Sequence, residues 1–247
     1  MNTSTGTGAG TDPRALRVID AWAATPGRAV IFDFNGTLSD DEPILFRLYT
    51  EMFRERLQWT LTPRQYFQRL GGRSDREIID IVVEEIAGGD EKLSRDLLAE
   101  RRTRYCDLVE HQSPILPATV DMVRRLADHG VPMGIVTGAQ RVDVEFVLSR
   151  SPLAGAFTAI VTVEDVTRGK PDPEGFELGA QRMGVEPAAV LVFEDSVFGA
   201  RAARSAGMRC VAVEGTVTRA ELEGDADAVV SGLSPDLFAI LQQDGRR

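Results

Sequence analysis

The sequence predicts an α/β protein with a doubly wound parallel sheet and an inserted four-helix domain, on two observations. From residue 114 onward, short apolar runs alternate with helical patterns, and repeated strand–helix units form parallel sheets with right-handed crossovers. Residues 40–113 carry helical patterns alone, directly after the first apolar run. A chain of 247 residues that is 43% hydrophobic can bury a sizeable core.

The amino-acid composition excludes several kinds of binding partner. The formal net charge of −10 argues against nucleic acid or anionic membranes, although a local basic pocket can still hold a small anionic substrate. Cys106 and Cys210 are far apart, so neither a disulfide framework nor a zinc site is indicated. No apolar run approaches the roughly 18 residues of a membrane span, and the N-terminus lacks secretory-signal features. We therefore expect a cytoplasmic protein.

The N-terminal region leads into the first strand. Residues 1–12 are rich in Gly, Thr and Ser and predict a disordered tail. Pro13 follows an N-cap aspartate and starts a helix. Residues 29–32, Ala-Val-Ile-Phe, show no polar alternation, which favours a strand covered on both faces. That strand delivers Asp33 to a loop in which Gly36 permits a tight turn.

The helical patterns that follow predict a small bundle. After a first apolar stripe, the capping-box patterns Thr62-Pro63-Arg64-Gln65 and Ser74-Asp75-Arg76-Glu77 each start a helix, and Gly88-Gly89-Asp90 caps a fourth. Four helices with one apolar stripe each should pack together. We expect a helical domain over residues 40–113, inserted into a Rossmann-like core that consists of residues 13–39 and 114–247.

The core should contain five further strands. Apolar runs predict them over residues 133–136, 159–161, 189–193, 210–213 and 228–230. Helical patterns separate most of these runs, and a last helix is expected over residues 237–241.

Three of the six strands end in polar residues, which are Asp33 with Asn35, Thr137 with Gly138, and Glu194 with Asp195. In open α/β sheets, sites form at the carboxyl ends of strands. Carboxylates gathered there would repel one another unless a cation lay among them. Mg²⁺ prefers oxygen ligands and is commonly held by carboxylates together with a substrate phosphate.

A lysine lies in the loop Gly169-Lys170-Pro171-Asp172-Pro173, where prolines restrict the backbone. It is one of only two lysines in the chain. With Mg²⁺, Lys170 and the Thr137 hydroxyl would bind the oxygens of a phosphoryl group while Asp33 attacks it. The product of that attack would be an aspartyl phosphate.

The order of these motifs resembles the haloacid dehalogenase (HAD) superfamily. The motifs are DxNGT, a strand-ending threonine, GKPDP, and FEDS followed by Gly199 and AAxxAG, from about Asp33 to Gly207. The helical insertion falls where the β-phosphoglucomutase and phosphoglycolate phosphatase branch carries its cap domain. The resemblance implies that Asp33 is the nucleophile and that Thr137 and Lys170 bind phosphate.

The resemblance also implies a metal site. Asp33, Asp195 and the main-chain carbonyl of Asn35 would hold Mg²⁺, with Glu194 close by through water. We take Asp33, Asn35 and Lys170 as the catalytic residues, and Gly138 joins Thr137 in substrate binding.

Asn35 departs from the family pattern. Family phosphatases usually have an aspartate there, which protonates the leaving alcohol and later activates water. Asparagine cannot exchange a proton, and loss of acid–base help typically costs about 10²–10⁴ in rate. Three alternatives stay open: a slow or good-leaving-group phosphatase, with Asp40 or Asp41 reached through water; a phosphate-binding or regulatory protein; or deamidation of Asn35, which precedes glycine.

Two further positions bear on the substrate. Leu45 stands where β-phosphoglucomutase-like sequences carry a histidine, which disfavours a phosphomutase. The stretch Leu70-Gly71-Gly72-Arg73-Ser74 resembles the substrate-contacting loop of this branch. Arg73 or Arg76 could therefore reach the distal anionic part of a substrate, the alternative being a capping turn with solvated arginines. We expect a Mg²⁺-dependent phosphatase of a small phosphorylated metabolite, as a monomer or homodimer.

Overall fold

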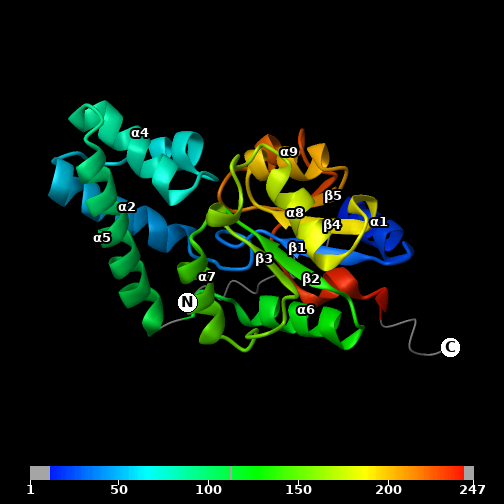
Figure 1. Cartoon of the computed structure of the whole chain (residues 1–247). Coiled ribbons are helices and arrows are strands. Elements are labelled where there is room, and N and C mark those ends of the chain that lie inside the picture. The colour runs from blue at the N-terminus through cyan, green and yellow to red at the C-terminus, as the bar shows by residue number, and fades with distance from the viewer. Residues whose placement is uncertain (1–11, 112, 242–247) are drawn as a thin grey trace, which may run out of the picture.

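The structure, a computed structural model, describes residues 12–111 and 113–241. In this part of the chain, six strands form one sheet of parallel pairs in the order β3-β2-β1-β4-β5-β6 (Figure 1). The strands are β1 (Ala29–Phe32), β2 (Met133–Val136), β3 (Ala159–Val161), β4 (Val190–Glu194), β5 (Arg209–Val213) and β6 (Ala228–Val230). The order reverses at β1, which lies between β2 and β4, so the predicted doubly wound sheet is confirmed.

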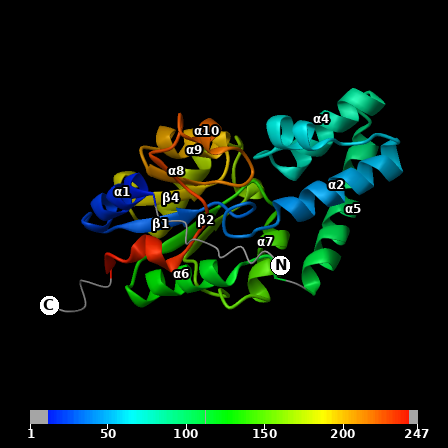
Figure 2. The same cartoon turned by 180° about the vertical axis from the view of Figure 1, so that it is seen from behind.

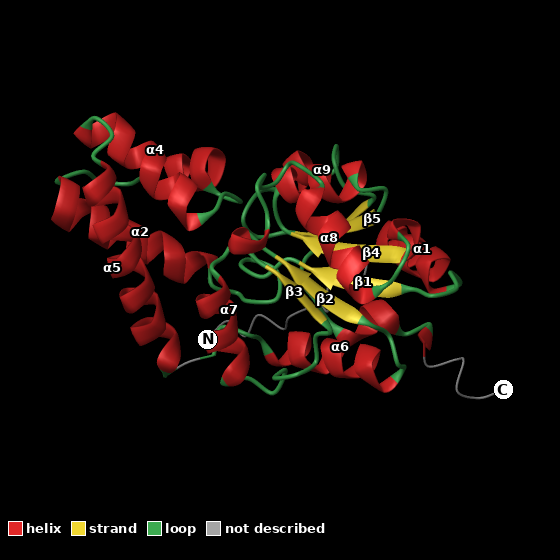
Figure 3. Cartoon of the chain, in the orientation of Figure 1, coloured by secondary structure: helices red, strands yellow, loops and turns green. Residues whose placement is uncertain are grey.

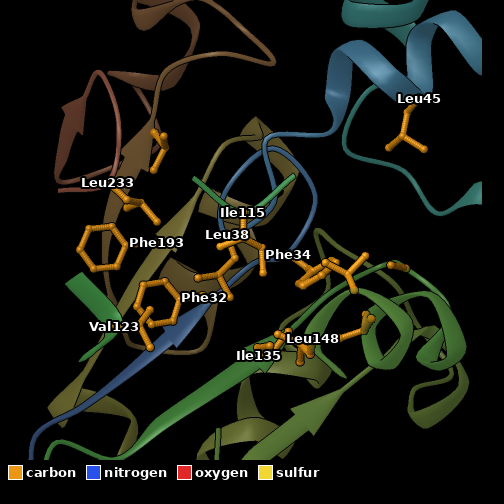
Figure 4. Close-up of a cluster of buried hydrophobic side chains, with 14 of the residues drawn as sticks. Phe32, Phe34, Leu38, Leu45, Ile115, Val123, Ile135, Leu148, Phe193 and Leu233 are labelled. Carbon is orange, nitrogen blue, oxygen red and sulfur yellow. The ribbon is translucent and has the colours of Figure 1, made fainter. Parts of the chain in front are cut away.

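The central strand β1 contributes to two separate cores. Val30 and Phe32 belong to one cluster of buried side chains and Ile31 to the other, because successive residues of a strand point to opposite faces. Figure 4 shows part of the first cluster, where Phe32 stacks on Phe193 with ring centroids 5.4 Å apart. Burial on both faces explains why the run Ala-Val-Ile-Phe has no polar alternation.

Helices cover both faces of the sheet (Figure 3). Side chains of α1 (Pro13–Ala23), α6 (Pro117–Asp128) and α7 (Arg141–Ser149) join the first cluster. Those of α8 (Glu174–Met183) and α9 (Val197–Ser205) join the second. The shorter elements are the 3₁₀ helices η2 (Val163–Asp165), η3 (Pro187–Ala189) and η4 (Pro235–Phe238), and helix α10 (Arg219–Leu222).

A helical insertion follows β1 and lies beside the carboxyl end of that strand, as the two views from opposite sides show (Figures 1 and 2). It comprises α2 (Glu42–Leu57), α3 (Pro63–Gln65), the π-helix η1 (Tyr66–Leu70), α4 (Asp75–Ala87) and α5 (Glu91–Glu110). The structure thus has the four expected helical segments, of which the second is short and continues as η1. None of the helices in the described residues combines the length and the apolar character that spanning a bilayer requires.

The predicted helix starts of the insertion are confirmed. Thr62 and Gln65 form one capping box, and Ser74 and Glu77 form the other. The Asp90 carboxylate accepts hydrogen bonds from the first N–H groups of α5. These contacts satisfy backbone donors that have no partner inside a helix, which is why the patterns could be read from sequence.

Some boundaries differ from the predictions. Strand β4 runs one residue further than expected and includes Glu194. Of the helix expected over residues 237–241, the described residues contain the 3₁₀ helix η4, which begins at Pro235 and ends at Phe238, and a helical Leu241 at their end. Of the predicted tail, residues 1–11 lie outside the described residues, whereas Asp12 caps α1. Residues 242–247 of the predicted core also lie outside them.

Candidate active site

Three strand ends bring the predicted polar residues together. Asp33 follows β1, Thr137 follows β2, and β4 ends at Glu194 before Asp195. Because β1 lies between β2 and β4, these carboxyl ends meet at one edge of the sheet. All four residues line a single cavity. The same cavity is also lined by the predicted site residues Asn35, Gly138, Lys170 and Arg73.

Lys170 bridges two of the carboxylates. Its Nζ donates hydrogen bonds to Asp33 Oδ1 and to Glu194 Oε1, each at 2.5 Å. Burial on its own would lower the pKa of Lys170, but the adjacent Asp33 and Glu194 carboxylates outweigh it and raise that pKa. Burial raises the pKa of Asp33 to about 7, even though Lys170 opposes the shift. The lysine therefore stays charged and leaves the acidic groups only partly neutralised.

The carboxylates fit a divalent cation. Oxygen atoms of Asp33, Glu194 and Asp195 lie within 4.8 Å of one another, and all three residues are buried. Burial, followed by the charges of Glu194 and Asp33, raises the pKa of Asp195 well above its ordinary value. Three carboxylates against one lysine leave an excess of buried negative charge, which Mg²⁺ with its preference for oxygen ligands would relieve.

Asp195 is oriented by two hydroxyl groups. Thr37 Oγ1 donates to its Oδ1 at 3.3 Å, and Thr216 Oγ1 donates to its Oδ2. Thr216 was not among the predicted site residues. It follows β5, the neighbour of β4, so the rule that sites gather at strand ends could have found it.

Two glycines make room for the carboxylates. Gly36 has a φ of +74°, and a Cβ at this position would lie 2.0 Å from Asp195 Oδ2. A Cβ on Gly199 would lie 1.8 Å from Glu194 Oε1. Only glycine can occupy either position while the acidic side chains stay where they are.

Asn35 lines the cavity but turns its amide toward a buried acid. Its Nδ2 donates to Asp41 Oδ2 at 2.8 Å, and that oxygen also accepts from Ser39 and Tyr105. Asp41 is fully buried. It thus contacts Asn35 directly. Neither Asp41 nor Asp40 is among the cavity-lining residues.

The structure separates the two candidate arginines. Arg73 lines the cavity, with its guanidinium 5.2 Å from the ring centroid of Phe198. Arg76 is not among the lining residues, and its Nη1 lies 3.8 Å from Asp80 Oδ2 on the exposed side of α4. Arg73 precedes the helix and Arg76 lies in its first turn, so the two side chains point in different directions.

The insertion supplies the remaining wall of the cavity. Its lining residues include the apolar or aromatic side chains Leu45, Tyr49, Tyr66 and Ile78. Leu45 is buried and has no proton to exchange.

A buried arginine ties the insertion to the core. The Arg101 side chain of α5 is 1% exposed, and its Nε lies 3.0 Å from Asp75 Oδ1 of α4. Its Nη1 donates to Asp143 of α7 in the core. The Tyr49 hydroxyl also donates to Asp75 Oδ1, at 2.5 Å. Since Asp75 and Tyr49 line the cavity, this network connects one cavity wall to the core.

Comparison with known proteins places the chain in a family. A model of the haloacid dehalogenase-like hydrolases matches residues 28–207, which is more than half of the chain. The protein therefore belongs to the haloacid dehalogenase-like hydrolases.

Its relatives include named phosphatases. The chain is 35% identical over 188 residues to fructose-1-phosphate phosphatase YqaB of Escherichia coli (strain K12), which covers 74% of this chain and 95% of that protein. It is 31% identical over 228 residues to (DL)-glycerol-3-phosphatase 2 of Arabidopsis thaliana, covering 85% and 91%. The fold matches the β-phosphoglucomutase (pgmB) of Clostridium difficile with a TM-score of 0.75 at 21% identity, over 88% of this chain and 96% of that one. The resemblance to this branch is thereby confirmed.

Proposed function

We propose that the protein is a Mg²⁺-dependent phosphoric monoester hydrolase that acts on a small phosphorylated metabolite. The observation that carries the proposal is the meeting of Asp33, Lys170 and Asp195 in one cavity at the edge of the sheet. Relatives named as phosphatases of fructose 1-phosphate and glycerol 3-phosphate support a small phosphorylated substrate.

Each residue has a part in the reaction. Asp33 attacks the phosphorus and forms an aspartyl phosphate, and water then hydrolyses that intermediate. Lys170 and the Thr137 hydroxyl, with backbone N–H groups near Gly138, bind the phosphoryl oxygens. Asp33, Asp195 and the Asn35 carbonyl hold Mg²⁺, with Glu194 nearby. The ion supplies neutralisation of charge on the phosphoryl group.

A second candidate is a phosphate-binding or regulatory protein with weak or no catalysis. One observation favours it: Asn35 cannot exchange a proton, and its amide is engaged with Asp41. A phosphomutase is less favoured, because Leu45 stands in the cavity where a proton-exchanging side chain would be needed. Cytoplasmic location, the absence of nucleic-acid or membrane partners, and a monomeric or homodimeric state stay predictions.

Hydrolysis of an aryl phosphate with and without Mg²⁺ tests the proposal. We expect Mg²⁺-dependent turnover by the natural chain and none by Asp33→Asn. Turnover that survives Asp33→Asn would overturn the aspartyl-phosphate mechanism. An inactive natural chain that gains turnover through Asn35→Asp would favour the binding protein. Intact-mass and peptide analysis of the active preparation decides whether Asn35 is deamidated, since an unmodified asparagine eliminates that account.

A further inference from the structure

Glu42 is a cavity-lining carboxyl group that the site described above leaves unused. It is the first residue of α2, so it reaches the cavity from the helical insertion, whereas Asp33 comes from the end of β1. Its Oε2 atom is buried and has no hydrogen-bond partner among the described residues. A buried oxygen without a partner costs free energy, and a group that enters the cavity can remove that cost by bonding to it.

The other carboxylates that line the cavity are engaged. Lys170 pairs with Asp33 and Glu194. Threonine hydroxyls bond both oxygens of Asp195. Asp75 Oδ1 is paired with the buried arginine of α5, whereas its Oδ2, like Glu42 Oε2, has no hydrogen-bond partner among the described residues. Unlike Asp75, Glu42 has no ion pair among the described residues, so its unbonded oxygen is free to meet the leaving group of a substrate.

The surroundings of Glu42 favour its neutral, protonated form. Burial, followed by the charge of Asp41, raises the pKa of Glu42 to about 8, although a hydrogen bond with the Tyr66 hydroxyl opposes the shift. The ionisable groups that face it from the surrounding elements and the cavity are Asp33, Asp41, Tyr49, Tyr66, Arg73, Asp75, Lys170, Glu194 and Asp195. The positive end of helix α2 stabilises the carboxylate that remains once the proton has left.

We infer that Glu42 performs the proton transfers that Asn35 cannot, as general acid toward the leaving oxygen and as general base toward the attacking water. The inference rests on the proposed phosphatase function. The acid–base group then comes from the helical insertion, whereas the nucleophile Asp33 comes from the core. Asp41 is unsuited to this task, since it is fully buried outside the cavity lining and its Oδ2 accepts three hydrogen bonds.

Both half-reactions balance. In the first, an Asp33 oxygen bonds to phosphorus, the phosphorus–ester oxygen bond breaks, and that oxygen takes its electron pair and the Glu42 proton to leave as an alcohol. In the second, Glu42 as carboxylate removes a proton from water while the water oxygen bonds to phosphorus. The bond between Asp33 and phosphorus then breaks, which releases hydrogen phosphate, the Asp33 carboxylate and protonated Glu42.

The first test compares two leaving groups in Glu42→Gln, which keeps the shape of the side chain but carries no exchangeable acid proton. We expect kcat/KM for glycerol phosphate, a poor leaving group, to fall about 10²-fold, and that for 4-nitrophenyl phosphate to fall less than about threefold. In wild type, kcat/KM for glycerol phosphate should decline above pH about 8 as Glu42 loses its proton, and Glu42→Gln should lack this decline.

Glu51→Gln is the matched control, because it removes the same charge from an exposed position of the same helix. It should match wild type on both substrates. Equal losses on both substrates in Glu42→Gln, or no loss, would overturn the inference while leaving the phosphatase intact. Activity that survives Asp33→Asn would instead remove the proposed function itself.

A second measurement does not depend on turnover. In protein with ¹³C-labelled glutamate, magnetic resonance titration should show one carboxyl group with a midpoint near pH 8 that is missing in Glu42→Gln. Titrations with and without Mg²⁺ and inorganic phosphate then report the protonation of Glu42 in the loaded site. Ordinary acidic titration of every glutamate under both conditions would contradict the assignment.

Discussion

The two walls of the cavity differ in the kind of side chain that lines them. The core wall, formed by Asp33, Thr137, Lys170, Glu194 and Asp195, consists of polar groups at strand ends with specific hydrogen-bond partners. The insertion wall, formed by Glu42, Leu45, Tyr49, Tyr66, Arg73, Asp75 and Ile78, is mainly apolar or aromatic. A fixed polar wall suits the phosphoryl group that all phosphate monoesters share. Under the proposed function, the insertion wall faces the leaving group.

The largest expected effect concerns Arg101, which joins the helical insertion to the core. Arg101→Met leaves Asp75 and Asp143 buried without their common cation, and breaking a buried ion pair costs about 3–5 kcal/mol of unfolding free energy. Urea denaturation measures the change. Arg102→Met, at an exposed position of the same helix, should change it by less than about 0.5 kcal/mol. Similar stability of the two variants would mean that the ion pairs of Arg101 do not hold the insertion against the core.

A substitution in the core wall should disturb chemistry more than stability. In Gly199→Ala, the new Cβ would lie 1.8 Å from Glu194 Oε1, so Glu194 must move away from Lys170. We expect kcat/KM to fall about 10²-fold, since a displacement of this kind misplaces reacting groups. The rise in Tm caused by Mg²⁺ should also shrink.

The control for this position is Gly224→Ala, where an added Cβ meets nothing within 4 Å. It should leave both kcat/KM and the Mg²⁺ effect on Tm unchanged. If Gly199→Ala behaves in the same way, the core wall tolerates movement of Glu194 and is less rigid than we infer.

The core wall could largely be predicted from the sequence, and the insertion wall could not. Apolar runs identify parallel strands, and the carboxyl ends of parallel strands meet at one edge, so Asp33, Thr137 and Asp195 were placed together correctly. Capping boxes likewise located the helix starts at Ser74 and Thr62. In both cases the signal is local or follows from a fixed topological rule.

The remaining features depend on how the helical insertion sits against the sheet. The contact of Asn35 with Asp41 also involves Tyr105, which is far away in the sequence. Whether Glu42 or Asp41 faces the cavity depends on the orientation of α2, and the same is true of Arg73 and Arg76 at α4. No local pattern determines these orientations, because they arise from packing between elements.

A substrate contact on the insertion wall should alter binding alone. We expect Arg73→Ala to raise KM about tenfold with kcat unchanged, because the guanidinium would hold a distal part of the substrate in ground and transition states alike. Arg76→Ala, in the first turn of the helix that Arg73 precedes but outside the cavity lining, is the control and should leave KM unchanged. Equal KM values for the two variants would mean that Arg73, like Arg76, is a solvated side chain at the helix start and does not contact the substrate.

The smallest effect is expected at Asp165, whose ion pairs with Arg141 and Arg182 lie in the core outside the cavity. It shows how much unfolding free energy a less buried ion pair contributes. Although burial alone would raise the pKa of Asp165, hydrogen bonds from Arg182 and Thr162 and the charge of Arg141 hold it below its ordinary value of 3.8. A lowered pKa in the folded state adds stability above the unfolded pKa, and this contribution is lost as the pH falls below it. Asp165→Asn should therefore destabilise the protein by about 0.5–1 kcal/mol at pH 7. In urea denaturation the difference from wild type should shrink below pH 4, roughly where the unfolded carboxyl group takes up its proton. A difference that stays constant with pH would show that the side chain acts through shape and neutral hydrogen bonds, in which case Arg182 and Arg141 contribute no charge interaction there.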